Sequence, residues 1–169
     1  MKTKYYLFLL FSLLFFGCSS PAKKLKTTYN ADEGMVVGTI CIENKIYNGF
    51  TFVYTDDKPA VNNYPNESGK FTYKYTSGDF NEKGKTYFLF SIVKPKGKYK
   101  FHKVQIFNNS RNDPSRFELP MDIKFEIVEG KTTYLGQVNV NVQKKLFSLE
   151  DKIDRDRTWF AEKAPQIQF

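Results

Sequence analysis

The chain has 169 residues, of which 17% are aromatic and 26% are charged, and its formal net charge is +8. This length supports one domain with a hydrophobic core and is too short for two, and the excess of basic residues favours a partner with negative charge. A single histidine, His102, and two cysteines argue against a zinc site and a catalytic triad. We therefore expect no metal, no cofactor and no enzymatic activity.

The N-terminal stretch is the most specific part of the sequence. Two lysines precede an apolar run over residues 5–16, which is too short to cross a bilayer as a helix and is followed by Gly17-Cys18. This arrangement resembles the lipobox of bacterial lipoproteins. The resemblance implies that residues 1–17 are a signal peptide and that Cys18 carries a diacylglycerol, which would anchor the protein stably with further acylation. An ordinary signal peptide and an uncleaved anchor helix are the alternatives.

Residues 18–32 are predicted to be a lipidated tether, because they have no apolar periodicity. Their three lysines could contact anionic lipid or belong to a solvated spacer. Some surface-exported lipoproteins have acidic residues directly after the cysteine, and none follows Cys18 here. The resemblance therefore implies a periplasm-facing location in the bacterial cell envelope. We expect the membrane and an envelope protein as partners, and no nucleic acid.

From Met35 onward the apolar residues recur at the strand period of two. Turn residues at 94–97 predict a hairpin between the strands 87–93 and 98–107, and Glu129-Gly130 predicts a second hairpin. Further strands are predicted over residues 35–42, 50–55, 70–75, 123–127 and 134–142. The predicted fold class is mainly β: a single antiparallel β-sandwich of about seven strands over residues 33–145.

Residues 146–169 are predicted to be a C-terminal α-helix and tail that pack on the sandwich. The apolar residues between Leu146 and Ala164 fit one helical stripe, Ser148 and Asp151 fit a capping box, and Pro165 provides a stop. A shorter helix from Arg155 to Lys163, capped by Asp154, is the alternative.

Two short motifs carry a second resemblance. The segments Pro95-Lys96-Gly97-Lys98-Tyr99 and Tyr134-Leu135-Gly136 look like strand signatures of small exported bacterial domains with an immunoglobulin-like or prealbumin-like sandwich. This resemblance implies a fold and transfers no catalytic residue.

Two surfaces are candidates for binding. A lysine-aromatic patch could bind an anionic lipid or glycan, although lysines on exposed strands also prevent edge pairing; its residues are Lys94, Lys96, Lys98, Tyr99 and Lys100. The predicted loop 108–120 could anchor a protein through Arg111, Arg116 and Phe117, or it could be a plain crossover. We expect an envelope lipoprotein that binds another envelope protein or an assembly component, with the anionic lipid or glycan as the alternative ligand.

Overall fold

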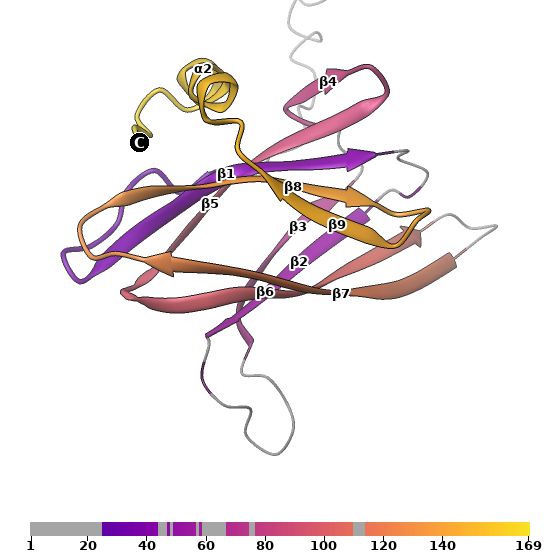
Figure 1. The fold of residues 1–169 in the computed structure, drawn as a ribbon, viewed down its shortest axis with the longest axis horizontal. Helices are drawn as coiled ribbons and strands as arrows, with labels where there is room; N and C mark the ends of the chain where they lie inside the picture. The colour runs from indigo at the N-terminus through magenta and orange to yellow at the C-terminus, as the bar shows by residue number, and fades with distance from the viewer. Residues whose placement is uncertain are drawn as a thin grey trace, which may run out of the picture.

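The computed structural model describes residues 25–43, 47, 49–56, 58, 67–74, 77–109 and 114–169. In this part of the chain nine strands form two stacked sheets, and one helix covers the outer face of the larger sheet (Figure 1). The predicted fold class, a mainly β sandwich with a C-terminal helix, is confirmed, and the described strands number nine where the sequence predicts about seven.

The larger sheet has the order β4-β5-β1-β8-β9, and the smaller sheet has the order β3-β2-β6-β7. The strands of the larger sheet are β4 (Phe80–Glu82), β5 (Lys85–Pro95), β1 (Glu33–Glu43), β8 (Thr132–Asn141) and β9 (Leu146–Glu150). Those of the smaller sheet are β3 (Glu67–Lys74), β2 (Gly49–Asp56), β6 (Gly97–Asn109) and β7 (Pro114–Ile127). The helix α2 spans Ile153–Lys163.

Strand β1 lies in the middle of the larger sheet and is buried on both faces. Its even-numbered residues, such as Ile40 and Ile42, pack between the sheets against aromatic side chains of the smaller sheet. Its odd-numbered residues, such as Val37 and Cys41, pack beneath α2 with Trp159. This alternation explains why the sequence of β1 is a nearly continuous apolar run.

The strand pairs of the described residues are antiparallel with one exception, since β1 and β8 run parallel. Parallel neighbours need a long connection between them. Here that connection is supplied by the strands from β2 to β7, most of which lie in the other sheet.

Both predicted hairpins are wrong, because each turn carries the chain from one sheet to the other. β5 pairs with β1, whereas β6, directly after it, pairs with β2 and β7. β7 likewise belongs to the smaller sheet, and β8 returns to the larger one. The two crossovers lie close together, with Lys96 Nζ 2.8 Å from a carboxylate oxygen of Glu129.

Two further boundaries differ from the prediction. The stretch 108–120 is mostly strand, because β6 continues to Asn109 and β7 begins at Pro114. The helix begins only at Ile153, because residues 146–150 pair with β8 as β9. The N-cap residue is Lys152, and its side chain makes no capping hydrogen bond, so neither the Ser148 capping box nor an Asp154 cap forms. Of the two predicted helices, the shorter one, from Arg155 to Lys163, is nearer to the structure.

The chain from Leu25 onward belongs to the folded domain. Leu25 and Tyr29 pack against the apolar cluster beneath α2, and the backbone N–H of Glu33 donates to the carbonyl of Asn30 at 3.0 Å. The second half of the predicted tether is therefore docked on the larger sheet. The described residues contain no helix that is long and apolar enough to cross a membrane.

Candidate functional site

The side of the sandwich where the edges of β3 and β5 face each other carries three adjoining hollows. We call them the tyrosine hollow, the edge hollow and the N-terminal hollow, with volumes of about 450, 280 and 510 Å³. Lys94 lines the first two, and Lys26 and Val93 line the last two. The three hollows therefore form one continuous surface.

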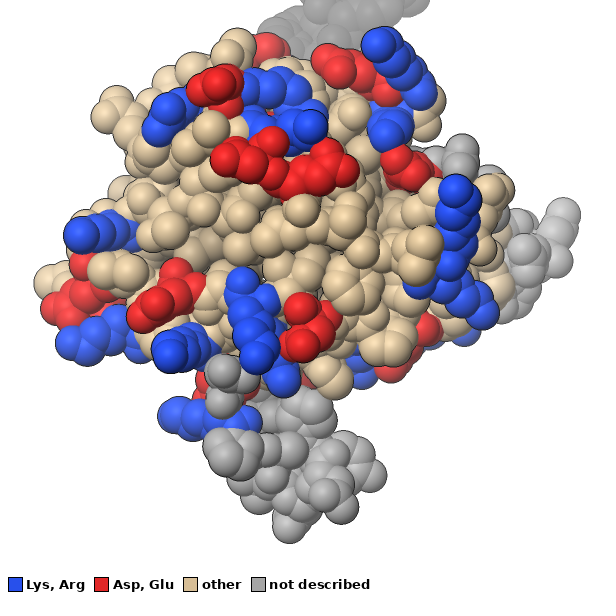
Figure 2. Space-filling view, viewed as in Figure 1, with Lys and Arg blue, Asp and Glu red and all other residues tan. Residues whose placement is uncertain are grey.

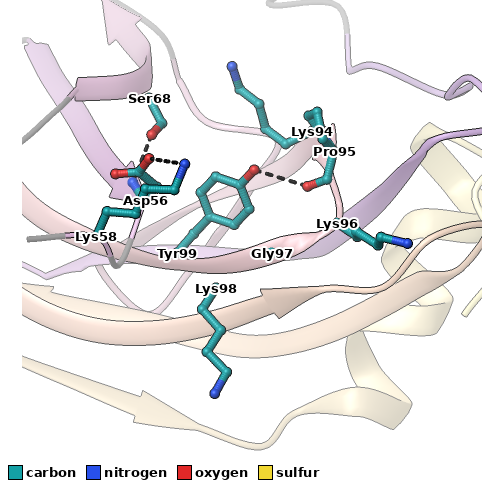
Figure 3. A pocket seen from close by; sticks show the side chains of 9 residues that line it. All are labelled: Asp56, Lys58, Ser68, Lys94, Pro95, Lys96, Gly97, Lys98 and Tyr99. Carbon is teal, nitrogen blue, oxygen red and sulfur yellow. Dashed lines mark hydrogen bonds and ion pairs between the residues drawn. The ribbon is translucent and has the colours of Figure 1, made fainter.

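The tyrosine hollow is built where β5 crosses to β6, and Figure 3 shows Tyr99 at its centre. The Tyr99 hydroxyl donates to the carbonyl of Pro95 at 2.9 Å. Burial, followed by the nearby carboxylate of Asp56, raises the pKa of Tyr99. The backbone N–H of Asp56 donates to Ser68 Oγ at 2.7 Å, while its buried Oδ1 has no partner among the described residues.

The lysines around this hollow do not converge. In Figure 3 the side chains of Lys94, Lys96 and Lys98 leave the backbone in three different directions. A compact anion could not contact all three ammonium groups together. The arrangement instead fits a partner that extends over several side chains.

The edge hollow opens between the two sheets and has a partly apolar lining. It is formed by residues 69–71 of β3, residues 91–94 of β5, and the side chains Lys26 and Tyr54. Tyr54 is 7% exposed, and burial raises the pKa of Tyr54 to about 12. Its hydroxyl is therefore a proton donor at neutral pH, and it has no hydrogen-bond partner among the residues that the structure describes.

Six lysines line the three hollows, and we call them the lysine strip: Lys26, Lys58, Lys70, Lys94, Lys96 and Lys98. Two of them face a carboxylate, since Lys96 bonds to Glu129 and Lys58 Nζ lies 3.7 Å from Asp56. The other four make no ion pair with any described residue. Their charge is thus available to a partner.

The structure brings together four of the five predicted patch residues. Lys94, Lys96, Lys98 and Tyr99 all line the tyrosine hollow. Lys100 stands apart, because it is a half-buried residue of β6 opposite Thr55 of β2 and Lys124 of β7.

The residues predicted as a partner-binding loop are not gathered into a loop. Phe117 is a half-buried residue of β7 that packs against the core and contacts Tyr47, with ring centroids 5.2 Å apart. Arg116 is exposed and donates to Gln105 at 3.3 Å. Arg111 and the lipidation candidate Cys18 lie outside the described residues. Phe117 is thus committed to the fold.

Sequence reasoning missed Tyr54, Lys70 and the β5 residues Ser91 and Val93 as parts of this surface. They come from three strands, and only the sandwich topology brings them together. No local motif marks them. Lys26, by contrast, was marked by the sequence, as one of three lysines in the predicted tether.

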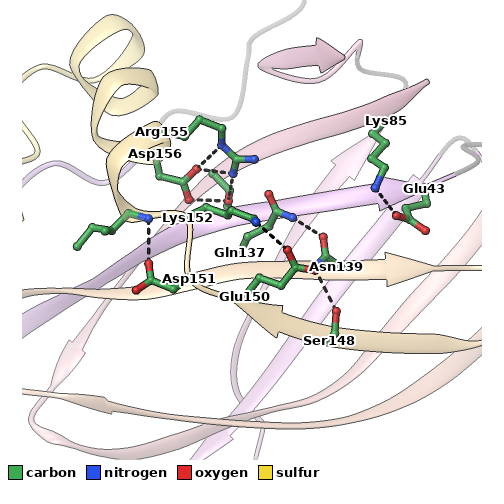
Figure 4. Close-up of polar contacts among 12 residues, drawn as sticks. Glu43, Lys85, Gln137, Asn139, Ser148, Glu150, Asp151, Lys152, Arg155 and Asp156 are labelled. Atoms are coloured by element: carbon green, nitrogen blue, oxygen red, sulfur yellow. Dashed lines mark hydrogen bonds and ion pairs between the residues drawn. The ribbon is translucent and has the colours of Figure 1, made fainter. Parts of the chain in front are cut away.

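A second polar cluster lies beneath α2 and is internally satisfied (Figure 4). Asp156 is fully buried and accepts hydrogen bonds from Thr39 Oγ1 and the Tyr134 hydroxyl, both at 2.8 Å. Arg155 Nε also donates to this carboxylate, at 2.9 Å, and its guanidinium lies 4.0 Å from the Trp159 ring centroid. Both carboxylate oxygens of Asp156 accept hydrogen bonds from these neighbours. The cluster therefore connects α2 to the larger sheet.

The other chemically reactive groups lie apart from one another. Cys41 is a free, fully buried cysteine, and burial raises the pKa of its thiol to about 11. Among the described residues, no three His, Cys, Asp or Glu side chains gather as potential metal ligands.

The opposite side of the sandwich, with the edges of β7 and β9, has a mixed surface. Figure 2 shows basic and acidic side chains interspersed around an uncharged band on this face. Leu146 and Leu149 of β9 are 60% and 44% exposed. The four lysines without an ion pair to a described residue line the hollows on the β3 and β5 side.

Comparisons with known proteins give little further information. No family model matches the sequence, and no curated protein matches it. Among solved structures, the fold is similar to part of a leucine-rich repeat protein from Bacteroides thetaiotaomicron, with 14% sequence identity and a TM-score of 0.40. The match covers 66% of this chain and 14% of that protein, and we draw no functional argument from it.

Proposed function

We propose that this chain is a membrane-anchored, non-enzymatic binding module of the bacterial cell envelope, held by a lipid on Cys18. Its partner is another envelope protein or an assembly component, which docks on the lysine strip. The observation that carries the proposal is the continuous surface of three hollows, with four lysines that make no ion pair with a described residue.

The shape and charge of the strip favour a macromolecular partner. Divergent lysines contribute little to holding a small anion, but they complement an acidic surface and speed its association. The hollows between them provide recesses for side chains of the partner. Because Phe117 packs against the core, we place the proposed docking surface on the β3 and β5 side rather than on β7.

An anionic lipid surface is the second candidate ligand, and one observation favours it. Lys26 belongs to the strip and lies eight residues after Cys18, which limits its distance from the lipid to at most about 30 Å. A lysine near an anionic membrane contributes about 1 kcal/mol of binding free energy. The anchor therefore keeps the strip within reach of the membrane surface.

Site-specific photo-crosslinking in intact cells tests the first candidate. A photo-reactive amino acid replaces Lys94 on the strip, and in a matched control it replaces Lys124, which is exposed on β7 at the opposite edge of the smaller sheet. We expect one envelope protein to be captured near stoichiometry from position 94 and not from position 124. Replacement of Cys18 by alanine should deplete this product.

Crosslinking of lipid alone from position 94 would reject the protein partner and favour the anionic membrane. Equal capture from positions 94 and 124 would show that the strip is not the docking surface.

A further inference from the structure

We propose that the free edge of β5 at Ser91 and Val93 accepts an extended acidic segment of the partner protein by strand addition. This inference rests on the proposed function and names the form of its ligand. The two residues line the edge hollow together with strip lysines that make no ion pair with a described residue.

The direction of the backbone groups in β5 follows from three hydrogen bonds. The Tyr87 carbonyl accepts from the Asp79 N–H at 2.8 Å, and the Leu89 N–H donates to the Asp79 carboxylate at 2.7 Å. The Leu89 carbonyl accepts from the Tyr73 hydroxyl at 2.9 Å. The odd-numbered residues of β5 therefore direct their N–H and C=O groups away from β1.

Ser91 and Val93 continue this alternation. β4 pairs only with residues 85–87 of β5, so among the described residues no strand lies beside Ser91 and Val93 on their outer side. Their two N–H and two C=O groups face the edge hollow without a hydrogen-bond partner in that part of the chain. Unpaired backbone groups of an edge strand are a template for another strand.

The free edge is short and has defined ends. At one end the backbone groups of Leu89 are already bonded to Asp79 and Tyr73. At the other end Pro95 has no N–H, and its carbonyl accepts from Tyr99. The site thus fits a few residues of extended chain rather than a long strand.

The N–H and C=O groups of Ser91 and Val93 provide both donors and acceptors, which favours a peptide over a phosphate or a carboxylate ligand. An anion accepts hydrogen bonds and could use the N–H groups, but it would leave the carbonyl groups of Ser91 and Val93 unpaired. An extended peptide offers both an N–H and a C=O at alternate residues. It would pair all four groups.

The side chains around the free edge of β5 favour a negatively charged partner segment. Lys26, Lys70 and Lys94 line the same hollow and make no ion pair with a described residue. The Tyr54 hydroxyl, which has no hydrogen-bond partner among the described residues, adds a further donor. It lies so close to Gly69 that a Cβ at position 69 would come within 2.2 Å of it. Glutamate or aspartate side chains on the added strand would meet these groups.

Fluorescence anisotropy with the full, lipidated chain in neutral detergent tests strand addition. The probe is a short labelled peptide of alternating glutamate and valine. One control peptide is N-methylated at alternate residues, which removes its donors, and another has lysine in place of glutamate. We expect the first peptide to bind, and both controls to bind at least about ten-fold more weakly.

Two variants of the protein locate the site. Ser91→Pro removes an N–H that points away from β1, so it leaves the ladder with β1 intact, whereas Ser91→Val keeps that N–H. We expect Ser91→Pro to weaken peptide binding about ten-fold or more and Ser91→Val to leave it unchanged. Lys70→Gln with Lys94→Gln should weaken binding and flatten its dependence on salt.

Circular dichroism melting shows whether Ser91→Pro folds; if it does not, the N-methylated peptide carries the backbone test with the protein unchanged. No binding of the acidic peptide at millimolar concentration, or equal binding of its N-methylated form, would overturn strand addition. Binding to vesicles that contain phosphatidylglycerol, without peptide binding, would assign the lysines to the membrane instead.

The envelope crosslinking experiment separates this inference from the proposed function. A partner captured from position 94 with the same yield in the Ser91→Pro variant would leave the proposed function in place and reject strand addition. The absence of any captured partner would reject the protein-binding function itself.

Discussion

Asp156 is a carboxylate without exposed surface in the first turn of α2, and it connects the helix to the larger sheet. Its removal would leave the hydroxyls of Thr39 and Tyr134 and the guanidinium of Arg155 without their acceptor. Breaking a buried, hydrogen-bonded charge pair costs about 3–5 kcal/mol. We expect Asp156→Ala to lower the free energy of unfolding by this amount in urea titrations followed by circular dichroism.

Asp156→Asn is the matched control, because the amide keeps the volume and one acceptor oxygen. We expect a smaller loss for this variant than for Asp156→Ala. Equal stability of Asp156→Ala and the original chain would show that the cluster beneath α2 does not hold the helix.

Glu43 links three strands, since it accepts from Lys85 Nζ at 2.5 Å and from Asn141 Nδ2 at 2.9 Å. The bond from Lys85, followed by that from Asn141, lowers the pKa of Glu43. A carboxylate with a lowered pKa stabilises the fold above its unfolded pKa of about 4.3, and this contribution is lost as the pH falls through the folded value.

We therefore expect Glu43→Gln to flatten the loss of stability below about pH 4.3 and to lower the stability at pH 7. Urea titrations at a series of pH values measure both effects. Glu126→Gln, at an exposed carboxylate of β7 with no ion pair to a described residue, is the control. Parallel pH profiles for the original chain and Glu43→Gln would contradict this role.

At the scale of elements, α2 depends on its docking, because an isolated helix of 11 residues is marginal in water. Trp159 is one of its two buried aromatic residues: its ring stacks on Phe80 with centroids 4.4 Å apart and meets Tyr87 edge-on at 5.0 Å. We expect Trp159→Ala to cost about 3–5 kcal/mol, with Trp159→Phe costing less. Guanidinium titrations that show Trp159→Ala unfolding like the original chain would mean that the helix contributes little to stability.

Seven of the nine described strands were predictable from the sequence, whereas β4, β9 and the pairing of the strands were not. A period of two marks strands such as β1 and β2, because side chains alternate between the two faces. The turn residues at 94–97 and at Glu129-Gly130 mark real reversals, but a reversal within one sheet and a crossing between sheets use the same local chemistry. Which sheet receives the next strand depends on distant partners, so the two hairpins were mispredicted.

The C-terminal boundary shows the same limit. Leu146 and Leu149 fall on the helical stripe by spacing, yet both belong to β9. Pairing with β8 provides backbone hydrogen bonds that local propensity does not reveal. Ile153 and Phe160, further along the stripe, do lie in the helix.

At the scale of the whole molecule, the sequence revealed the lysines near the β5 to β6 crossover but not the surface that they share. Lys94, Lys96 and Lys98 form a visible local cluster. Lys70 lies more than twenty residues earlier and Lys26 earlier still, and they join the surface only because β3 and the docked N-terminal segment lie beside β5. Residues from different strands that meet only in the folded sandwich are not marked by any local sequence motif.

The distribution of lysines leads to a last prediction about the whole molecule. Lys85 has a carboxylate partner, Glu43, whereas Lys26, Lys70 and Lys94 line one hollow without such a partner among the described residues. We expect replacement of these three by glutamine to leave the melting temperature unchanged or to raise it at low salt, because repulsion between like charges is relieved.

This difference should vanish at high salt, where screening removes the repulsion. The control, Lys85→Gln, should instead lower stability by up to about 1 kcal/mol. Differential scanning calorimetry at two ionic strengths measures both variants. A marked loss of stability in the triple variant would show that the strip lysines support the fold, whereas an unchanged or raised melting temperature leaves their charge available to an acidic partner.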